Sequence, residues 1–384
     1  MKFLLSAQNL REYLVQQRLH ISNNQNIQIE SKVSKNFNLL VTLPDKQRLF
    51  VKQESQNSKG KTSGQFLKEW RIREWLENFP ELSKISHLLS KALLFDKENS
   101  ILIFNYRDDY QDLEDISYIE ENDDSSLKIA GQIGSSLAKI HQATIDRENY
   151  RLFLAKDLTT VERKPSFIRG LKRVRPDVFR QVISENLKFF KLYQRASELR
   201  ASIQSLINNY QPRCLIHNDL KFDNILLHND YLHDYDNSTN PIIVIDWEKF
   251  AWGDPAYDLG KLIACHLNKW LSSIIISGEI DIQTALKLAT IPLEKVQPSI
   301  ANMAICYLKP FPEILNIYPN FWQRVIQFAG MSLIERIQIK IHYHEPIGNT
   351  GICMLQVAQS LLCYPEFSIK VIFGEQARKI FAFQ

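Results

Sequence analysis

Residues 215–227 read LIHNDLKFDNILL, and residues 244–248 read VIDWE. Asp219 and Asn224 lie five positions apart in a polar stretch between two apolar runs, and Asp246 follows the apolar run IIVI. The apolar runs predict short buried strands, and such strands do not need carboxylates at their ends. A set of Asp and Asn oxygens suits a hard, octahedral Mg²⁺ that also contacts phosphate oxygens. The two stretches therefore predict a magnesium site formed by Asn224 and Asp246.

The remaining carboxylate, Asp219, is a candidate catalytic base. A spare carboxylate near a magnesium–phosphate complex accepts a proton from an attacking hydroxyl group. A lone DxxxxN is more often a structural turn, because Asp and Asn favour turns for backbone reasons. Here, however, Lys52 ends the apolar part of LFVKQE (49–54), an acidic helix comes next, and the two aspartates come only after it. The ordered series predicts phosphoryl transfer.

The composition is that of an ordinary globular protein. Of 384 residues, 45% are hydrophobic and 23% are charged, and the formal net charge of +4 is too small to indicate nucleic-acid binding. The five cysteines form no CxxC pair, which fits free thiols in a reducing compartment and gives no zinc-ligand spacing. No uninterrupted apolar run reaches the roughly 18 residues of a membrane span. We expect a cytoplasmic protein with no nucleic-acid or membrane partner, and the sequence leaves its oligomeric state open.

The two halves of the chain differ in their periodicity. Before residue 107, short segments such as NFNLLVTL, QRLFVKQE and SILIFNY predict an antiparallel sheet, with one helix at 66–79. After it, long helical patterns dominate, and the clear strand candidates are CLI, NILLH and IIVID, the last two as a hairpin. We expect an α+β fold of two lobes. Residues 1–107 would be a small, nucleotide-binding N-lobe, and residues 108–384 a large helical C-lobe with the catalytic loop and the acceptor site.

Three motifs resemble one known family. The stretches HNDLKFDN, IDWE and GDPAYDLG (253–260) are similar to the HGDxxxxN, IDWE or IDFE, and GDPxxDLA segments of the aminoglycoside phosphotransferase and choline kinase-like branch of the protein-kinase fold. The resemblance covers about residues 30 to 265. It implies a bilobal, protein-kinase-like enzyme that uses ATP and magnesium. It also implies that Asp219 is the base, that Asn224 and Asp246 hold magnesium, and that Asp258 braces the loop.

The resemblance extends to the phosphate-binding lysine. Lys52 is similar to the lysine of the third strand in this family, which needs a glutamate partner from the next helix. Glu69 and Glu74 both lie on that helix. Glu69 shares a helical face with Ile72 and Leu76 and should point toward the core, whereas Glu74 has charged neighbours at spacings of three and four. We therefore expect Glu69 to be the partner of Lys52.

Further nucleotide contacts follow from the same resemblance. SILIFNYRDDYQDLED (100–115) is similar to the hinge strand, whose backbone reads the adenine, and this places Asn105 and Tyr106 there. Ile245 is either an apolar floor for the base or a core strand residue. Lys221 follows Asp219 by two positions, as does the lysine that touches the transferred phosphate in serine/threonine kinases. A catalytic contact and a solvated side chain both remain open for Lys221.

The sequence departs from the family pattern at two places. Asn218 stands where the family has the glycine of HGD, and SKVSKNFNLL (31–40) has no glycine where a glycine-rich loop would cover the nucleotide. The second departure, together with the absence of an APE segment, argues against an ordinary eukaryotic-type protein kinase. Neither departure removes a catalytic group.

The acceptor is the least determined part of the prediction. Residues 163–180 carry seven Lys or Arg residues and one Asp, which is either a solvated basic surface or a docking surface for an anionic acceptor. The run DWEKFAWGDPAYDLGKLIACHLNKW (246–270) also resembles kinases of lanthipeptide-type peptide maturation, which implies a Ser or Thr of an acidic precursor peptide. Two alternatives stay open: a kinase only for small aminoglycoside-, choline- or sugar-like molecules, and a pseudokinase that binds without turnover.

Overall fold

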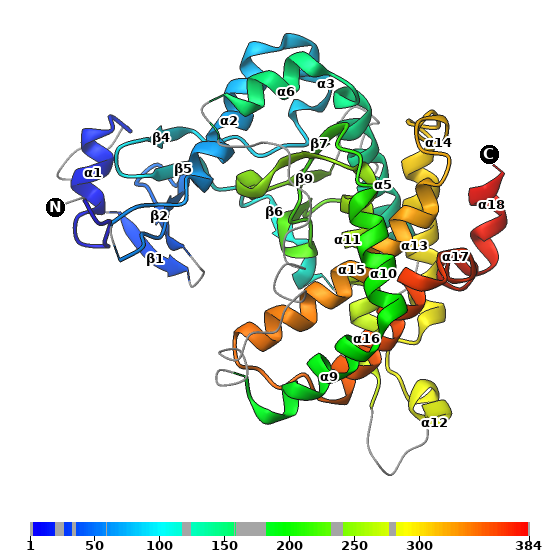
Figure 1. The fold of residues 1–384 in the computed structure, drawn as a ribbon. Helices are drawn as coiled ribbons and strands as arrows, with labels where there is room; N and C mark the ends of the chain where they lie inside the picture. Colours follow the sequence, from blue (N-terminus) through cyan, green and yellow to red (C-terminus); the bar gives the residue numbers. More distant parts are fainter. Residues whose placement is uncertain are drawn as a thin grey trace.

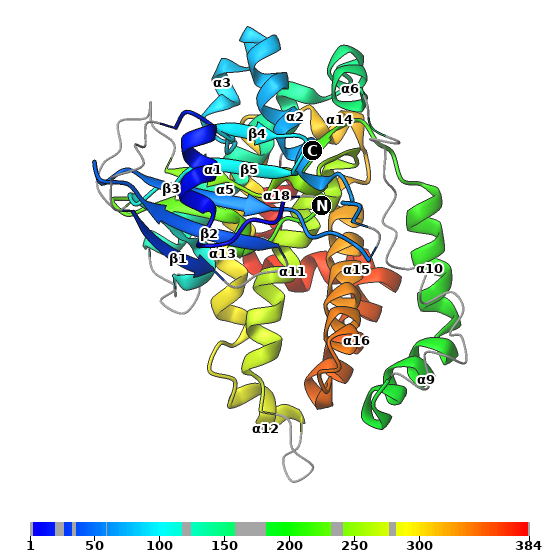
Figure 2. The same cartoon turned by 90° about the vertical axis from the view of Figure 1, so that its left-hand side faces the viewer.

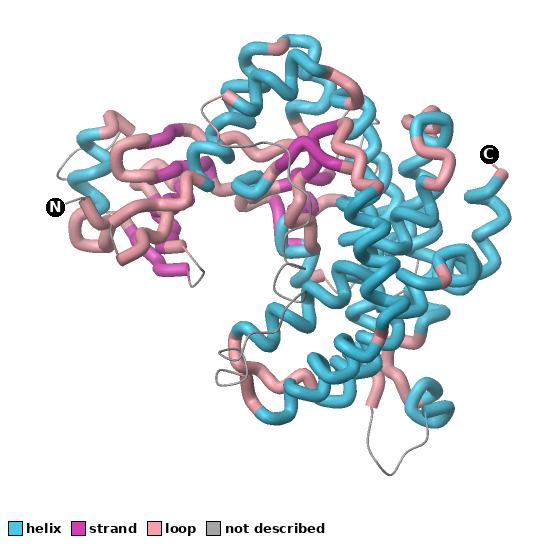
Figure 3. The backbone as a smooth tube through the Cα atoms, viewed as in Figure 1, coloured by secondary structure: helices cyan, strands magenta, loops and turns pink. Residues whose placement is uncertain are grey.

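The computed structural model describes residues 3–19, 27–32, 36–58, 60–116, 124–156, 158, 182–231, 241–275 and 282–382. Figure 1 shows a sheet-containing N-terminal part joined to a larger helical part. Figure 3 shows that strands gather in the N-terminal part and near the junction, while helices make up most of the remainder. The predicted α+β architecture with two lobes is confirmed. None of the helices in the described ranges is long and apolar enough to span a membrane.

The N-terminal sheet has five antiparallel strands. They are β1 (Gln28–Lys32), β2 (Phe37–Thr42), β3 (Arg48–Gln53), β4 (Leu94–Asp96) and β5 (Ile101–Asn105), in the order β1-β2-β3-β5-β4. Helix α2 (Gln65–Asn78) leaves the sheet after β3, and the chain returns to it through η1 (Pro80–Leu82) and α3 (Ser83–Ser86). The central position of β3 places Lys52 between β2 and β5, directly opposite Leu102.

The two faces of this sheet are covered by different helices. Because successive side chains of a strand point to opposite faces, Val51 and Lys52 lie on different sides. Val51 packs in one cluster with Leu10 and Leu14 of α1 (Leu10–Gln16), which crosses the sheet in Figure 2. The other face packs Leu102 against Phe66 of α2. Lys52 therefore lies on the α2 side of the sheet.

Two small sheets carry the motif segments of the second lobe. Strands β6 (Tyr110–Asp112), β8 (Ile225–His228) and β9 (Ile242–Val244) form one sheet in the order β6-β8-β9. Ile225 pairs with Val244 and Leu227 with Ile242, so the expected hairpin is confirmed. Strand β7 (Cys214–Ile216) pairs instead with β10 (Ala251–Gly253), a strand that the sequence did not predict. These pairings bring 214–228 and 242–253 side by side.

The helices pack around these small sheets in one hydrophobic core. They are α5 (Asp124–Thr144), α6 (Glu148–Ala155), α9 (Leu187–Arg195), α10 (Ser197–Asn208), α11 (Pro255–Ser273), α12 (Ile282–Lys287), α13 (Leu293–Leu308), α14 (Ile314–Ile317), α15 (Phe321–His342), α16 (Gly348–Cys363), α17 (Pro365–Phe373) and α18 (Ala377–Phe381). Helix α13 packs along α5, and α15 packs along both α11 and α16. The C-terminal helices thus belong to the core that holds α11 in place.

The contact between α5 and α13 depends on a glycine. A Cβ atom on Gly134 would lie 2.0 Å from the carbonyl oxygen of Met303. Gly134→Ala is therefore expected to lower the free energy of unfolding by about 1–3 kcal/mol, because the two helices must move apart. Denaturant unfolding measures the effect. Ser135→Ala, at the next position of α5, is the matched control and should change stability by less than about 0.5 kcal/mol; equal stability of the two variants would contradict this packing.

Candidate active site

The loop after β7 carries the first motif, and a residue of α11 holds it through hydrogen bonds. Asp258 of α11 is fully buried and accepts two backbone hydrogen bonds, from His217 N at 2.6 Å and from Asn218 N at 2.9 Å. Burial raises the pKa of the Asp258 carboxyl, but the interaction with the His141 side chain and the backbone hydrogen bond from His217 outweigh it, so the pKa lies below its ordinary value. Asp258 therefore stays an acceptor and fixes the backbone that precedes Asp219.

His217 ties this loop to the segment of the second motif. Its Nε2 lies 2.8 Å from the carbonyl oxygen of Ile245, and its Nδ1 accepts a hydrogen bond from the backbone N–H of Asp219 at 3.3 Å. The Ile245 carbonyl requires a donor and the Asp219 N–H requires an acceptor, so these two contacts place the ring proton on Nε2. The ring also packs against Trp247, with centroids 4.8 Å apart. His217 was not predicted from the sequence to have a role, although it is the first residue of the HND motif.

Asn224 and Asp246 lie next to each other at the end of the small sheet. Asn224 lies at the end of η4 (Phe222–Asn224), and its Nδ2 donates to the carbonyl oxygen of Asp219 at 2.9 Å. The backbone carbonyl oxygen of Asn224 accepts a hydrogen bond from the backbone N–H of Ile245 at 3.0 Å. Asp246 precedes η5 (Trp247–Lys249) with φ 61° and ψ 52°, a left-handed conformation that is uncommon outside glycine, asparagine and aspartate. The local backbone thus turns the Asp246 carboxylate out of the strand.

Lys52 reaches this carboxylate from the N-terminal sheet. Its ammonium forms an ion pair with Asp246, across 194 positions of sequence, and the lysine side chain is only 9% exposed. The rings of Phe50 and Phe104 lie 5.5 Å and 5.3 Å from the same nitrogen. Burial would lower the pKa of Lys52, but the charges of Asp246 and Glu69 outweigh it and raise the pKa. The predicted phosphate-binding lysine and the predicted metal ligand therefore share one site.

The carboxylate of Asp246 is held in its charged form. Burial raises the pKa of this group, but the adjacent Lys52 ammonium and its hydrogen bond lower it below the ordinary value. An ionised carboxylate beside the amide of Asn224 is the donor set of a hard cation that completes its shell with phosphate oxygens and water. The two side chains therefore fit Mg²⁺.

Glu69 and Glu74 have different surroundings on α2. Glu69 is 3% exposed, and neither of its carboxylate oxygens has a hydrogen-bond partner among the described residues. Glu74 is paired with Arg71, with Oε2 2.8 Å from Nη1, and accepts a hydrogen bond from the indole of Trp70. The structure therefore places Glu69 in the electrostatic environment of Lys52 and Glu74 elsewhere, while the ammonium itself contacts Asp246. The direct pairing of Lys52 with Glu69 stays a prediction.

The burial of Glu69 predicts a pH dependence of stability. Burial raises its pKa to about 8, although the charge of Lys52 lowers it. Between its ordinary pKa of 4.5 and 8, the folded protein binds more protons at this group than the unfolded chain, so stability falls as pH rises. We expect a fall of about 1–2 kcal/mol between pH 6 and pH 8 in the ligand-free protein.

Unfolding of Glu69→Gln at the two pH values tests this prediction, because the variant has no proton to lose. It should show a smaller fall than the wild-type protein, whereas Glu74→Gln, the paired carboxyl on the same helix, should behave as wild type. An identical pH dependence in Glu69→Gln and the wild-type protein would contradict the assignment.

The two lysines near the loop pair with different carboxylates. Lys221 lies 2.6 Å from Asp223, and both side chains are half-exposed. Lys249 of η5 lies 2.6 Å from Asp219 and was not identified from the sequence. Asp219 has a lowered pKa, because the charges of Lys261 and Lys249 outweigh the raising effect of its burial. The direct cationic contact of the candidate base is thus Lys249, and Lys221 contacts a different group.

The predicted hinge residues lie at the end of β5. Asn105 is exposed, and its side chain accepts a hydrogen bond from Gln47 at 2.9 Å. The backbone N–H of Tyr106 donates to the carbonyl oxygen of Arg48 at 2.9 Å, and the Arg48 guanidinium lies over the tyrosine ring. Both backbone groups of Ile245 are also engaged, with Asn224 and His217 as described above. Contacts of these three residues with adenine stay a prediction, and the N–H of Tyr106 is already used.

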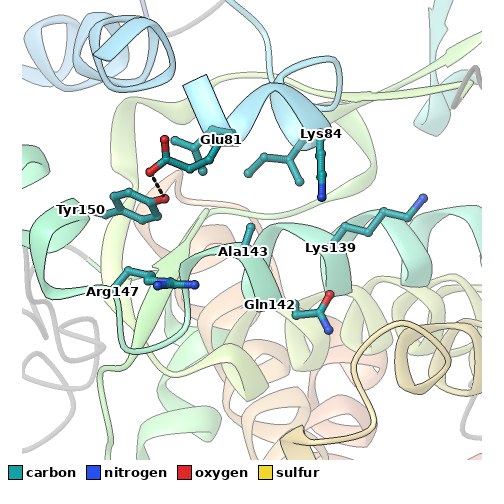
Figure 4. Close-up of a pocket in the computed structure, with 9 residues that line it drawn as sticks. Glu81, Lys84, Lys139, Gln142, Ala143, Arg147 and Tyr150 are labelled. Atoms are coloured by element: carbon teal, nitrogen blue, oxygen red, sulfur yellow. Dashed lines mark hydrogen bonds between the residues drawn. The ribbon is translucent and has the colours of Figure 1, made fainter. Parts of the chain in front are cut away.

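A cavity of about 450 Å³ lies apart from these residues, between η1 with α3 and the α5–α6 segment. Figure 4 shows Lys84, Lys139 and Arg147 around it, with the hydroxyl of Tyr150 donating to Glu81 at 2.8 Å. Its lining includes none of the motif residues. The three cationic side chains are exposed. The cavity is therefore separate from the candidate active site.

Comparisons with known proteins identify the family and the fold. Residues 27–276 match the model of a family described as APH, the phosphotransferase enzyme family. The structure is similar to an ethanolamine kinase of Plasmodium vivax, with 14% identity, a TM-score of 0.54, and coverage of 96% of this chain and 92% of that chain. It is also similar to a choline kinase of Cryptosporidium parvum, with 13% identity, a TM-score of 0.56, and coverage of 98% and 100%. The search of curated protein sequences gives no significant match. The predicted protein-kinase-like fold is confirmed.

Proposed function

The chain belongs to the phosphotransferase enzyme family, and on that premise we propose that it is a kinase that moves the terminal phosphoryl group of ATP to a hydroxyl group of a small molecule. Membership in the family makes it an enzyme that transfers phosphate to a hydroxyl. The single observation that supports the nucleotide part is the ion pair of Lys52 with Asp246, beside Asn224 and the loop of Asp219. A kinase site needs a cation for the phosphates, oxygen ligands for the metal and a base, and these side chains supply all three.

Each of these side chains has a proposed task in binding the nucleotide. Lys52 would bind phosphate oxygens, with Glu69 as the carboxylate partner of its ammonium. Asn224 and Asp246 would hold Mg²⁺, which when bound neutralises charge on the triphosphate. Asn105, Tyr106 and Ile245 would border the adenine. The lobe boundary after residue 107, between β5 and β6, is part of the same proposal.

The transfer step is proposed to depend on Asp219. The acceptor hydroxyl would donate its proton to the Asp219 carboxylate as its oxygen attacks the terminal phosphorus in line with the leaving ADP. Asp258 and His217 support this step indirectly, because their side chains accept hydrogen bonds from the backbone N–H groups of residues 217–219. The lowered pKa of Asp219 keeps it ionised at neutral pH. It is therefore ready to accept a proton.

A small-molecule acceptor is the proposal that the comparisons favour. The two solved structures reported above are named as kinases of ethanolamine and of choline, which are small alcohols. The basic stretch at 163–180, which suggested an acidic precursor peptide, lies outside the described residues. The peptide acceptor and the likeness to lanthipeptide-type kinases therefore stay predictions from the sequence. The phosphate-binding lysine, the metal ligands and the base are all present as candidates, and this favours an active kinase over a pseudokinase.

An acceptor screen tests the proposed function. The protein is incubated with ATP labelled at the γ-phosphate, with and without Mg²⁺, and with choline, ethanolamine, aminoglycosides, sugars or an acidic Ser/Thr peptide. We expect Mg²⁺-dependent label in one class of small alcohol. Label in the peptide alone would show that the acceptor is a peptide and not a small molecule. Nucleotide-dependent thermal stabilisation without any ATP consumption would contradict the kinase proposal itself.

A further inference from the structure

Asn218 has a side chain where the family motif has glycine. Its φ is 68°, in the left-handed region that glycine adopts freely and that asparagine tolerates better than most residues. Glycine would serve this backbone equally well, so the conformation alone does not explain the asparagine. The side-chain Nδ2 donates to the backbone carbonyl oxygen of Lys249 at 3.0 Å. The asparagine thus links the catalytic loop to η5 at one particular residue.

Lys249 in turn contacts the candidate base. Its ammonium lies 2.6 Å from Oδ2 of Asp219, and the two side chains are 35% and 29% exposed, so the pair borders solvent. Among the described residues, Oδ1 of Asp219 has no hydrogen-bond partner. One oxygen of the carboxylate is therefore fixed by a cation, and the other is available to an acceptor.

The neighbouring lysines are engaged elsewhere. Lys261 of α11 is buried and paired with Glu335 of α15, at 2.9 Å. Lys221, which the motif suggested for the phosphate contact, is paired with Asp223. Of these three lysines, only Lys249 both contacts the base and borders solvent. Its ammonium is therefore placed to fix the Asp219 carboxylate and to stabilise negative charge that develops beside that carboxylate.

We propose that Lys249, anchored through its carbonyl by Asn218, is a positioning residue of the transfer step: it orients the Asp219 carboxylate through Oδ2 and places positive charge beside the phosphoryl group in transit. This inference rests on the proposed function. It transfers to Lys249 the task that the motif suggested for Lys221. A charge-assisted hydrogen bond of this length restricts the rotation of the carboxylate, and a cation near developing charge favours the transition state over the ground state.

Four variants test the inference through the split between kcat and KM. Lys249→Met should lower kcat about 10- to 100-fold, with the Kd for Mg–ATP within about twofold of wild type. Lys249→Arg should recover kcat to within about 10-fold of wild type, because it restores the charge. Asn218→Gly keeps the backbone conformation and removes the anchor, so it should lower kcat about 3- to 10-fold. Lys221→Met removes the lysine that the motif suggested for the same task, and it should lower kcat less than Lys249→Met does.

The outcomes separate this inference from the proposed function. The assay uses the acceptor found in the screen, or water as acceptor through the rate of ATP hydrolysis. A wild-type protein that turns over ATP while Lys249→Met keeps its full kcat would overturn the inference alone. So would a loss in Lys221→Met as large as that in Lys249→Met, or no recovery in Lys249→Arg. A wild-type protein with no turnover of ATP at all would overturn both. Unfolding midpoints of all variants identify any that fail to fold.

Discussion

Asp219→Asn is expected to lower kcat about 10²- to 10⁴-fold while the Kd for Mg–ATP stays within a few-fold of wild type. The amide keeps the size of the side chain but no longer accepts a proton from the acceptor hydroxyl. The backbone of the loop should be unchanged, because Asp258 and His217 bind backbone atoms that the substitution leaves in place. Single-turnover transfer measures the chemical step, and isothermal titration measures nucleotide affinity.

The matched control for this variant lies on the same loop. Asp223→Asn removes a half-exposed carboxylate that pairs with Lys221 and has no proposed catalytic task. It should change kcat by less than about threefold. Full activity in Asp219→Asn would rule out the assigned base. An equal loss in Asp223→Asn would show that the loop responds to any change of charge, and that Asp219 has no special role.

Asp246→Asn is expected to lose both turnover and the magnesium dependence of ATP binding. The substitution removes the only carboxylate of the proposed metal site and the ion-pair partner of Lys52. Mg²⁺ binds carboxylate oxygen much better than amide oxygen, so added magnesium should no longer tighten ATP binding. We expect kcat to fall at least about 10³-fold, because the metal and the lysine act on the same phosphates. ATP titrations at several magnesium concentrations measure the effect.

A nearby carboxylate provides the control for this measurement. The pKa of Asp112 is raised mainly by burial, and the negative charges of Asp115, Asp223 and Asp246 raise it further. Asp112 therefore lies in the electrostatic environment of Asp246. Asp112→Asn therefore changes the local charge without removing a proposed ligand, and magnesium should still tighten ATP binding to this variant. Retention of magnesium-dependent binding in Asp246→Asn would contradict the assignment of the metal site.

The sequence predicted those parts of the site that are local in the chain. The spacing of Asp219 and Asn224 puts both on one loop, and the pairing of β8 with β9 brings Asp246 beside Asn224. Apolar strand patterns on both sides of the polar segment NDYLHDYDNSTN (229–240) are enough to predict that hairpin. The contact of Lys52 with Asp246 across 194 positions followed only from the order of the motifs, because no local pattern encodes it.

The sequence did not predict contacts that depend on tertiary placement. Strand β10 pairs with β7, and the three residues of β10 carry no alternation that would reveal a strand. The ammonium of Lys221 pairs with Asp223, two positions away, and the ammonium of Lys249 pairs with Asp219, thirty positions away. A long lysine side chain reaches several carboxylates, so its partner is decided by backbone geometry such as the bond from Asn218 to the carbonyl of Lys249. Residue spacing does not report that geometry.

We propose that residues distant in sequence surround one Mg–ATP complex, and a crystal structure with a non-hydrolysable ATP analogue and Mg²⁺ would show whether they do. We expect Asn224 and Asp246 to contact the metal in that structure, and the ammonium of Lys52 to contact phosphate oxygens. A nucleotide bound away from these three residues, for example in the cavity bordered by Lys84 and Lys139, would contradict it.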